Sequence, residues 1–253
     1  MPDYSIRVLD RTISILKALM HSEMTLQEIS AETDVHKSTV FRILNTLEKE
    51  FWVQQDPKTG YYRLSFGLFE LGSSVANSLD FYKLSIPHLE RLVSTTKFTT
   101  HLVTCDNGKV LYLNKLESSN ELITQPSKVG YKVLMHCTAV GKVMLAYFDR
   151  VEIEKVIEKH GLPRFTPNTF TEKEALLKEL EVIRGQGCAI DNQEIQEGLR
   201  CIAAPLFAFH GKVMGAISIS GLIGDITEQT IPVLKEHVIQ AAKNISRDLG
   251  YQG

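Results

Sequence analysis

The stretch from Val35 to Lys49 constrains the fold of this chain more than any other part. Its apolar residues Val40, Leu44 and Leu47 recur at helical spacing, which predicts an amphipathic helix with one face in a core. The opposite face carries short hydroxyls, lysines, an arginine and an asparagine. Such a face suits the edge of a DNA groove, because Ser and Thr reach phosphates, Arg reads guanine and Asn reads adenine.

The flanking residues predict the rest of a small DNA-binding fold. An apolar stripe predicts a first helix over 5–20, and Thr25, followed three residues later by Glu28, forms a capping box that starts a second helix. Two strand-like stretches at 52–55 and 61–64 flank a turn of Asp, Pro, Lys, Thr and Gly. Three helices and a hairpin within about 65 residues indicate a winged helix-turn-helix.

The candidate DNA contacts come from these elements. We expect Arg42 to read a base edge, and Lys37 and the wing residue Lys58 to contact phosphates. The full set is Thr25, Gln27, Lys37, Ser38, Thr39, Phe41, Arg42 and Lys58. The alternative is a helix face that is merely solvated or that contacts protein. It has some support, since residues 1–64 carry eight basic and nine acidic side chains.

A second domain follows a linker. Residues 66–80 predict a linker helix, with residues 1–65 as the winged helix-turn-helix domain and residues 81–253 as a sensor-like domain. In the sensor-like domain we expect helices at 83–96, 139–148, 152–159, 172–186 and 228–249, and strands at 101–105, 109–116, 122–125, 188–191, 201–207 and 213–220. The pattern predicts an α+β fold with a mostly antiparallel sheet.

Two polar clusters in the second domain are candidates for a small-molecule site. The loop between Asp191 and Pro205 holds acids, a glycine and an arginine, and it is either the rim of a pocket or a solvated connection. Ser218 and Ser220 lie two residues apart on a strand, so their hydroxyls share one face and suit a carboxylate or a sugar hydroxyl. The alternative is a half-exposed strand that turns both serines toward water.

A third cluster, from His136 to Lys142, lacks the glycine and the hydroxyl that a phosphate-binding loop requires. We interpret Thr138 instead as the cap of a helix whose first N–H groups form an anion site. An enzymatic interpretation would join Cys201, His136 and Asp191 as nucleophile, base and orienting acid. It is disfavoured, because Cys201 lies in an apolar run that predicts a buried thiol with a raised pKa.

Composition limits the remaining classes. The net charge of −2 gives no overall electrostatic footprint for nucleic acid, although a basic face can lie on a neutral protein. The sequence has no apolar run of about 18 residues and no signal-peptide pattern at its N-terminus. The four cysteines are irregularly spaced, which predicts reduced thiols rather than disulfides or zinc ligands. We expect a cytoplasmic protein that is not an enzyme and needs no metal or cofactor.

The order of these motifs resembles the IclR family of bacterial transcription regulators over nearly the whole chain. The matching segments are residues 37–44, 60–64, 136–142, 191–205 and 215–221. Five segments in this order and at this spacing are highly specific. The acid-rich loop is also similar to that of the KdgR-type branch, whose members sense a deoxy-keto sugar acid.

The resemblance implies a winged helix and a C-terminal GAF-like effector domain, in a dimer or a dimer of dimers on double-stranded DNA with a pseudo-palindromic operator. We expect a repressor of a catabolic operon rather than an activator, controlled by a small carboxylate such as a keto acid, a sugar acid or an aromatic acid. The family's pocket positions correspond here to Leu122, Val133, Ala139, Val140, Asp191, Cys201, Ser218 and Ser220. Some members have Gly-Ala where this chain has Ala139-Val140, and the branched Val140 would narrow the mouth of the pocket.

Overall fold

The computed structural model describes residues 5–78, 80–118 and 127–252 of the chain. The chain forms two compact units, Met1–Leu79 and Asp80–Gly253. Among the helices of the described ranges, none combines the length and the apolar character that crossing a bilayer requires.

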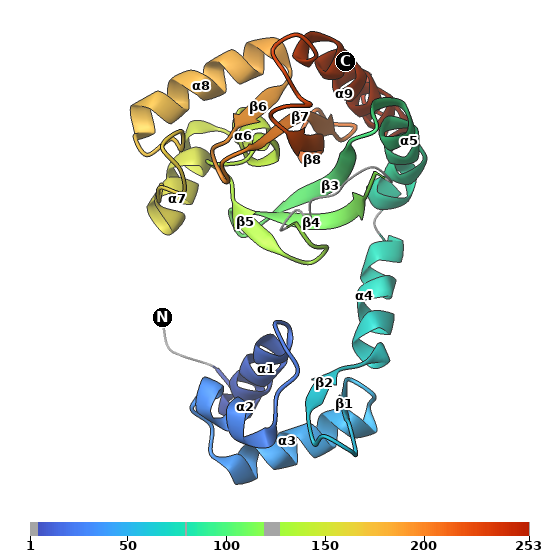
Figure 1. Ribbon diagram of the computed structural model, residues 1–253, viewed down its shortest axis with the longest axis vertical. Helices are drawn as coiled ribbons and strands as arrows, with labels where there is room; N and C mark the ends of the chain where they lie inside the picture. Colours follow the sequence, from blue (N-terminus) through green and yellow to red (C-terminus); the bar gives the residue numbers. More distant parts are fainter. Residues whose placement is uncertain (1–4, 79, 119–126, 253) are drawn as a thin grey trace. The chain divides into compact units, whose positions relative to one another are not determined.

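The first unit is a winged helix-turn-helix, as the sequence predicts. Helices α1 (Arg7–Leu19), α2 (Leu26–Thr33) and α3 (Lys37–Lys49) precede the antiparallel strands β1 (Val53–Gln55) and β2 (Tyr62–Leu64), and helix α4 (Phe66–Ser78) follows (Figure 1). One core joins the three helices to the hairpin, through Ile15, Leu19, Ile29, Val35, Val40, Ile43, Leu44, Leu47, Val53 and Tyr62. The predicted apolar face of α3 is therefore the face that packs.

Short-range hydrogen bonds set the tight connection between α2 and α3. The Thr25 and Glu28 side chains form the predicted capping box at the start of α2. Asp34 ends α2 in the left-handed region at φ 50°, a conformation that Asp adopts more readily than most residues. His36 then caps α3, with its Nδ1 accepting from the backbone N–H of Ser38 at 3.3 Å. The angle between the two helices is thus encoded by local contacts.

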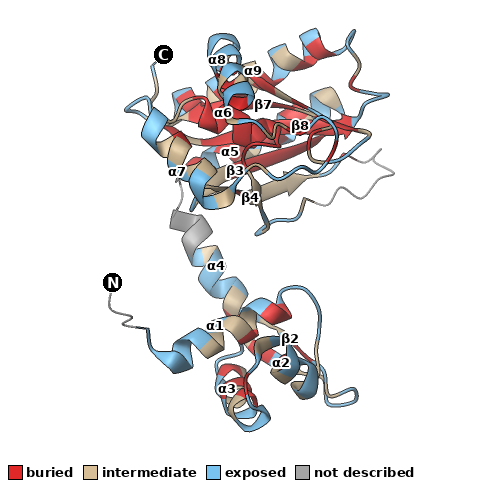
Figure 2. Ribbon diagram, turned by 90° about the vertical axis from the view of Figure 1, so that its left-hand side faces the viewer, coloured by how far each residue is buried: buried red, intermediate tan, exposed pale blue. Residues whose placement is uncertain are grey.

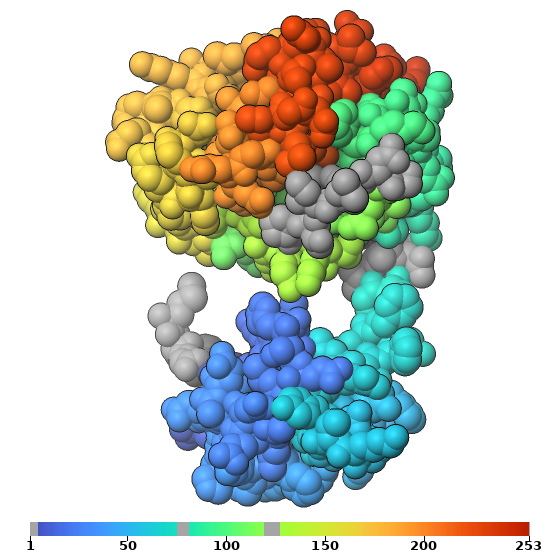
Figure 3. All heavy atoms as spheres, viewed as in Figure 1, coloured from blue at the N-terminus to red at the C-terminus, as the bar shows by residue number. Residues whose placement is uncertain are grey.

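The second unit places helices on both faces of one antiparallel sheet. Its strands are β3 (Thr99–Asp106), β4 (Lys109–Leu116), β5 (Lys132–Leu134), β6 (Ala189–Asn192), β7 (Leu199–Phe207) and β8 (Val213–Leu222), in the order β5-β4-β3-β8-β7-β6. Its helices are α5 (Asp80–Thr96), α6 (Ala139–Leu145), α7 (Arg150–His160), α8 (Lys173–Gln186) and α9 (Ile231–Asp248). Helices α5 and α9, far apart in the sequence, pack side by side on one face (Figures 1 and 3), whereas α6 and α8 pack together on the other side of the sheet.

The register of the sheet decides which polar residues meet. On the face toward α6, Cys201 lies opposite both Asp191 and Ser220, and His101 lies opposite Ser218. Because side chains alternate along a strand, the intervening apolar residues of β8 point to the other face. Figure 2 shows the result, with buried residues concentrated in the central strands and in α6.

The structure differs from the sequence expectations at two helix ends and in one strand. Helix α9 begins at Ile231 rather than 228, because Thr227 and Thr230 bond to each other in a turn before it. Helix α6 ends at Leu145 rather than 148, since the next N–H groups bond three residues back and tighten the last turn. Strand β5 was not predicted, and the strand predicted at 122–125 lies outside the described residues.

Gly141 in α6 marks the closest approach between this helix and the chain that precedes it. A Cβ atom at Gly141 would lie 2.7 Å from the carbonyl carbon of Met135 and would collide with its carbonyl oxygen and Cα. These are backbone atoms, so the contact cannot be relieved by a rotamer change. The glycine therefore lets α6 sit directly on the segment that leads into it.

We predict that Gly141→Ala lowers stability by about 1–3 kcal/mol, the usual cost of overpacking a core. The matched control is Gly185→Ala in α8, where a Cβ would meet nothing within 4 Å. That change is expected to raise stability by about 0.5–1 kcal/mol, because alanine is the better helix former. Thermal unfolding followed by circular dichroism measures both, and equal shifts in the two variants would contradict the close approach.

Candidate functional site

The outer face of α3 gathers most of the predicted DNA contacts. Lys37, Ser38, Phe41 and Arg42 are exposed and Thr39 is half-buried. Phe41 is 48% exposed although it is a large apolar residue, which leaves its ring available to a partner such as a thymine methyl group. The helix presents this polar face while Val40, Ile43, Leu44 and Leu47 hold it to the core.

His36 joins this face, and sequence reasoning missed it. Its Nδ1 lies 2.9 Å from the Ser38 hydroxyl and also accepts from the Ser38 N–H. A ring nitrogen that accepts carries no proton, so the proton of the neutral ring is on Nε2, which can donate to a phosphate. The signal in the sequence was a histidine immediately before the first turn of a helix.

Thr25 forms the cap of α2, and its place among the DNA contacts stays a prediction. Its hydroxyl donates to Glu28 Oε2 at 2.8 Å and accepts from the Glu28 N–H, and its own N–H also donates to that carboxylate. These donated hydrogen bonds lower the pKa of Glu28. Both donors of Thr25 are therefore used within the cap, whereas Gln27 beside it is exposed, as a phosphate contact requires.

The wing is a turn built by one carboxylate. Asp56 Oδ1 accepts from the N–H groups of Lys58 at 2.7 Å and Thr59 at 3.1 Å, and these bonds lower the pKa of Asp56. Gly60 closes the turn at φ 77°. The turn leaves the Lys58 side chain exposed at the tip of the hairpin, where the prediction places a phosphate contact.

The second candidate site is a cavity of about 310 Å³ between the sheet and the start of α6. This volume lies at the small end of the range for ligand pockets, about 300–1,000 Å³. Seven of the predicted pocket residues line it: Val133, Ala139, Val140, Asp191, Cys201, Ser218 and Ser220. The eighth, Leu122, lies outside the described residues.

The predicted helix cap Thr138 also lines the cavity, together with residues that the sequence did not single out: His101, Tyr112, Ser127, Tyr131, Ile195 and Leu199. His101 is buried, and the Tyr112 ring packs edge-on against it with 5.2 Å between ring centroids. Burial, and then the charge of Lys115, lower the pKa of His101 to about 3, so its imidazole is neutral at neutral pH. The periodicity of β3 marked His101 only as part of a strand.

Thr138 caps α6 as predicted. Its hydroxyl accepts from the Gly141 N–H at 3.1 Å. The first-turn N–H groups of Ala139 and Val140 have no intrahelical partner by the geometry of a helix, and both residues line the cavity. Ser218 and Ser220 are buried, so the alternative of a half-exposed strand that turns both serines toward water is wrong.

Asp191 is a buried acid in the cavity wall. Its Oδ1 accepts from the Glu194 N–H at 2.7 Å. Burial, and then the nearby Glu194 carboxylate, raise the pKa of Asp191 to about 7, although backbone hydrogen bonds and Lys142 act in the opposite direction. At neutral pH this side chain therefore both donates and accepts hydrogen bonds across the population of molecules.

The acid-rich loop serves mainly to anchor α6 and itself. Glu194 Oε1 and the buried Lys142 ammonium lie 2.5 Å apart, and the ring of Phe170 lies 4.8 Å from that ammonium. Arg200 donates to Asn192 Oδ1 and to the carbonyl of Ile226. Of the two interpretations of this loop, neither is complete, because Asp191, Ile195 and Leu199 line the cavity while Glu194 and Arg200 hold the loop to the rest of the unit.

The arrangement required for a cysteine nucleophile is not present among these residues. His136 Nε2 bonds to the carbonyl of Pro163 at 3.0 Å, and the ring lies beside Phe165. It is not among the residues that line the cavity with Cys201 and Asp191. The histidine therefore acts as a structural link within this fold.

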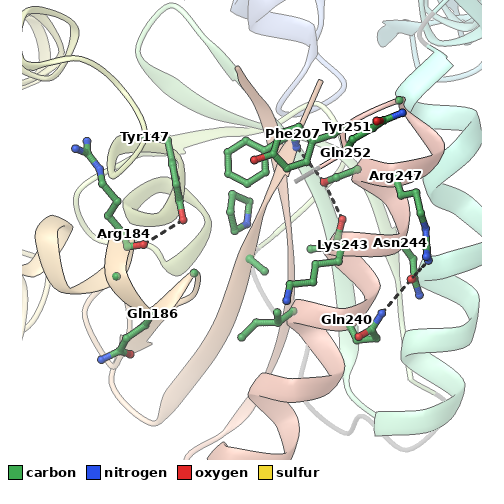
Figure 4. A pocket seen from close by; sticks show the side chains of 18 residues that line it. Tyr147, Arg184, Gln186, Phe207, Gln240, Lys243, Asn244, Arg247, Tyr251 and Gln252 are labelled. Carbon is green, nitrogen blue, oxygen red and sulfur yellow. Dashed lines mark hydrogen bonds between the residues drawn. The ribbon is translucent and has the colours of Figure 1, made fainter. Parts of the chain in front are cut away.

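A larger hollow of about 1020 Å³ lies on the surface of the second unit, between the end of α8, strand β7 and α9 (Figure 4). The rings of Tyr147 and Tyr251 flank Phe207, at centroid distances of 4.9 and 5.0 Å. Lys243 and Arg247 are exposed, and the buried Ser246 hydroxyl accepts from the Phe207 N–H. The smaller cavity is the better candidate site, because buried polar side chains from several strands converge on it.

Comparison with known proteins agrees with this architecture. The IclR helix-turn-helix domain matches residues 8–57, and the model described as bacterial transcriptional regulator IclR C-terminal matches residues 73–247. The transcriptional regulator KdgR of Escherichia coli is 35% identical over 95% of this chain and 92% of its own length. The transcriptional repressor AllR of Salmonella typhimurium is 32% identical over 96% of this chain and 90% of its own length. The crystal structure of Thermotoga maritima IclR covers 98% of this chain and 100% of that chain, with a TM-score of 0.82 and 29% identity.

A winged helix with an exposed polar recognition face, joined to an α+β domain, defines a DNA-binding transcription regulator. The matches span both units. The chain belongs to the IclR family of bacterial transcription regulators.

The raised pKa of Asp191 predicts a pH-dependent stability. An unfolded Asp ionises near pH 3.9, about three units below the folded carboxyl, so folding takes up a proton between these pH values. Stability contributed by this group therefore falls as the pH rises from about 4 to about 7 and is level above that.

Asn cannot ionise, so the stability of Asp191→Asn relative to wild type should rise between about pH 4 and about pH 7, by on the order of a few kcal/mol. The difference between the two thermal midpoints, measured across this pH range, reports the change. The same substitution at the exposed Asp225 is the control. A difference between Asp191→Asn and wild type that does not change with pH would refute the raised pKa.

Proposed function

We propose that this regulator is a cytoplasmic repressor of a catabolic operon and that a small carboxylate bound in the cavity of the second unit controls it. The chain belongs to a DNA-binding family, and the effector part of the proposal rests on one observation. Buried polar side chains from three strands and the start of a helix converge on one cavity. A relative named as a repressor, AllR, supports repression over activation.

In this proposal α3 enters the major groove of the operator. Arg42 reads a base edge, Phe41 packs against thymine methyl groups, and Lys37, His36 and the wing Lys58 hold phosphates. The unit is not basic overall, so the attraction to DNA depends on this local face and not on net charge.

A second copy of the chain completes the DNA-binding form. Ile6, Leu9 and Ile13 follow one side of α1 and are 60%, 54% and 49% exposed, while Phe66 and Phe69 of α4 are 80% and 71% exposed. Apolar stripes of this kind mark an interaction surface, since monomeric proteins rarely leave them uncovered. A dimer would place two recognition helices about one helical turn apart on a pseudo-palindromic site, and a dimer of dimers would pair two such sites.

The effector's carboxylate would bind the N–H groups of Ala139 and Val140 and the hydroxyl of Ser220, and the Ser218 hydroxyl would contact another part of the acid. Protonated Asp191 adds a donor on the other side of the cavity. The effector can change DNA affinity only if it binds two arrangements of the dimer with different affinity. We propose that α4, which leads from the winged helix to the second unit, transmits the change of arrangement to the DNA-binding unit.

The alternative from another class is a metabolite-binding enzyme that uses its winged helix only to dimerise. The position of His136 away from the cavity argues against it. DNA binding that weakens steeply with salt would exclude it, because phosphate contacts release counterions.

We predict that Arg42→Ala weakens binding to the operator by about 1–3 kcal/mol and relaxes its base preference, because a side chain on a base edge discriminates between sequences. Fluorescence anisotropy with the operator and with random DNA measures both affinities. Arg150→Ala, an exposed arginine of the second unit, is the control. An equal loss on both DNAs would show that Arg42 contacts only phosphate.

The regulatory proposal is tested by the same titration on DNA from upstream of the gene and its neighbours, with a panel of keto, sugar and aromatic acids. We expect tight binding by two or four chains per duplex, and release by one acid. The double variant Ser218→Ala, Ser220→Ala should keep its DNA affinity and require more acid for release. Failure to bind any fragment at low salt, or unchanged acid sensitivity in the double variant, would overturn the corresponding part.

A further inference from the structure

Three side chains form a continuous hydrogen-bonded chain along one wall of the cavity. His101 Nε2 lies 2.8 Å from the Ser127 hydroxyl, and His101 Nδ1 lies 3.3 Å from the Ser218 hydroxyl. All three residues line the cavity. They come from β8, the neighbouring β3 and the segment before β5, so the fold alone brings them together.

The number of donors in this chain is fixed, whichever tautomer the histidine adopts. A neutral imidazole has one N–H and one acceptor nitrogen, so one serine must accept from it and the other must donate to it. The serine that accepts keeps its own O–H for a ligand, and both serines keep acceptor lone pairs. The chain therefore offers one donor and several acceptors, which matches a hydroxyl and not a carboxylate.

The charges of the cavity lining also disfavour a second carboxylate on the ligand. Among the described residues that line the cavity there is no Lys or Arg, and Asp191 adds an acid. Lys115 lies opposite His101 in the register, but its ammonium is 2.8 Å from Glu117 and it does not line the cavity. A second carboxylate on the ligand would find neither a cation nor enough donors at the His101 end.

The two ends of the cavity are far enough apart to bind different groups. Asp191 is on β6 and His101 is on β3, three strands away in the sheet. At about 4.8 Å per strand, their backbones lie about 14 Å apart. Ser220, on β8 beside β3, lies between these two ends, so a ligand with its carboxylate there and at the start of α6 could direct its tail toward His101 and Ser127.

We infer that the chain of Ser127, His101 and Ser218 is a specificity determinant that accepts a hydroxyl on the tail of the effector. The effector is then a hydroxylated monocarboxylic acid, and neither a dicarboxylate nor an acid with a bare hydrocarbon tail. His101 acts as a positioning residue, because it orients both hydroxyls. The inference rests on the acid-controlled function proposed above and adds the chemistry of the tail.

Isothermal titration calorimetry on the full chain tests it with six-carbon acids of matched length. The probes are gluconate, galactonate and mannonate, compared with hexanoate, which has no hydroxyl, and with glucarate, which has a second carboxylate. We expect the tightest of the three hydroxylated monocarboxylates to bind wild type at least about tenfold more tightly than hexanoate, since two or more hydrogen bonds separate them. The same margin is expected over glucarate, because its second carboxylate would be desolvated without a cation.

Ser127→Ala is the decisive variant, because Ser127 is only partly buried and its loss leaves the sheet intact. It should weaken the hydroxylated acid by about threefold to tenfold and leave hexanoate unchanged, the effect of one lost hydrogen bond. Ser127→Thr, which keeps the hydroxyl, should retain the wild-type ratio of affinities. Ser85→Ala, a buried serine of α5 bonded to the Phe81 carbonyl, is the control for the same chemical change elsewhere.

The outcomes separate the two proposals. Equal weakening of both acids by Ser127→Ala, or a preference for hexanoate or glucarate in wild type, overturns the inference and leaves acid control standing. Absence of binding by every acid in this panel overturns the inference, and acid control falls only if the keto and aromatic acids of the anisotropy titration also have no effect.

Discussion

The ion pair between Lys142 and Glu194 holds the cavity of the second unit in shape. Lys142 is fully buried near the middle of α6, and its partner lies on the loop between β6 and β7. Each charge would be costly to bury alone, so the position of α6 and that of the loop depend on each other. Glu194 Oε2 has no hydrogen-bond partner within the described residues, so the pair is not satisfied completely. This incompletely satisfied ion pair lies where the start of α6 and Asp191 both line the cavity.

The first unit could be predicted almost entirely from the sequence because its determinants are local. The capping box at Thr25, the left-handed Asp34 and the turn built by Asp56 each depend on residues within five positions. The same locality sets the Thr25 side chain, whose hydroxyl donates to Glu28 within the cap.

The second unit could be predicted only in part. Its helices and longer strands have clear periodicity, but β5 has three residues and gives no usable pattern. The pocket positions were expected from family resemblance and not from the residues alone. His101 and Ser218 are 117 residues apart, and only the pairing of β3 with β8 shows that they meet. Long-range register is the information that a single sequence does not contain.

Gly141 limits how this regulator could change its choice of effector. The backbone of Met135 occupies the space that any side chain at that position would need, so this part of α6 is closed to substitution. New preferences must therefore arise at other positions that line the cavity, which are Ala139, Val140 and the residues of the strands and loops. The wall with the greatest freedom to vary is the one formed by β3, β4 and the segment before β5, so relatives that respond to different acids should differ there first.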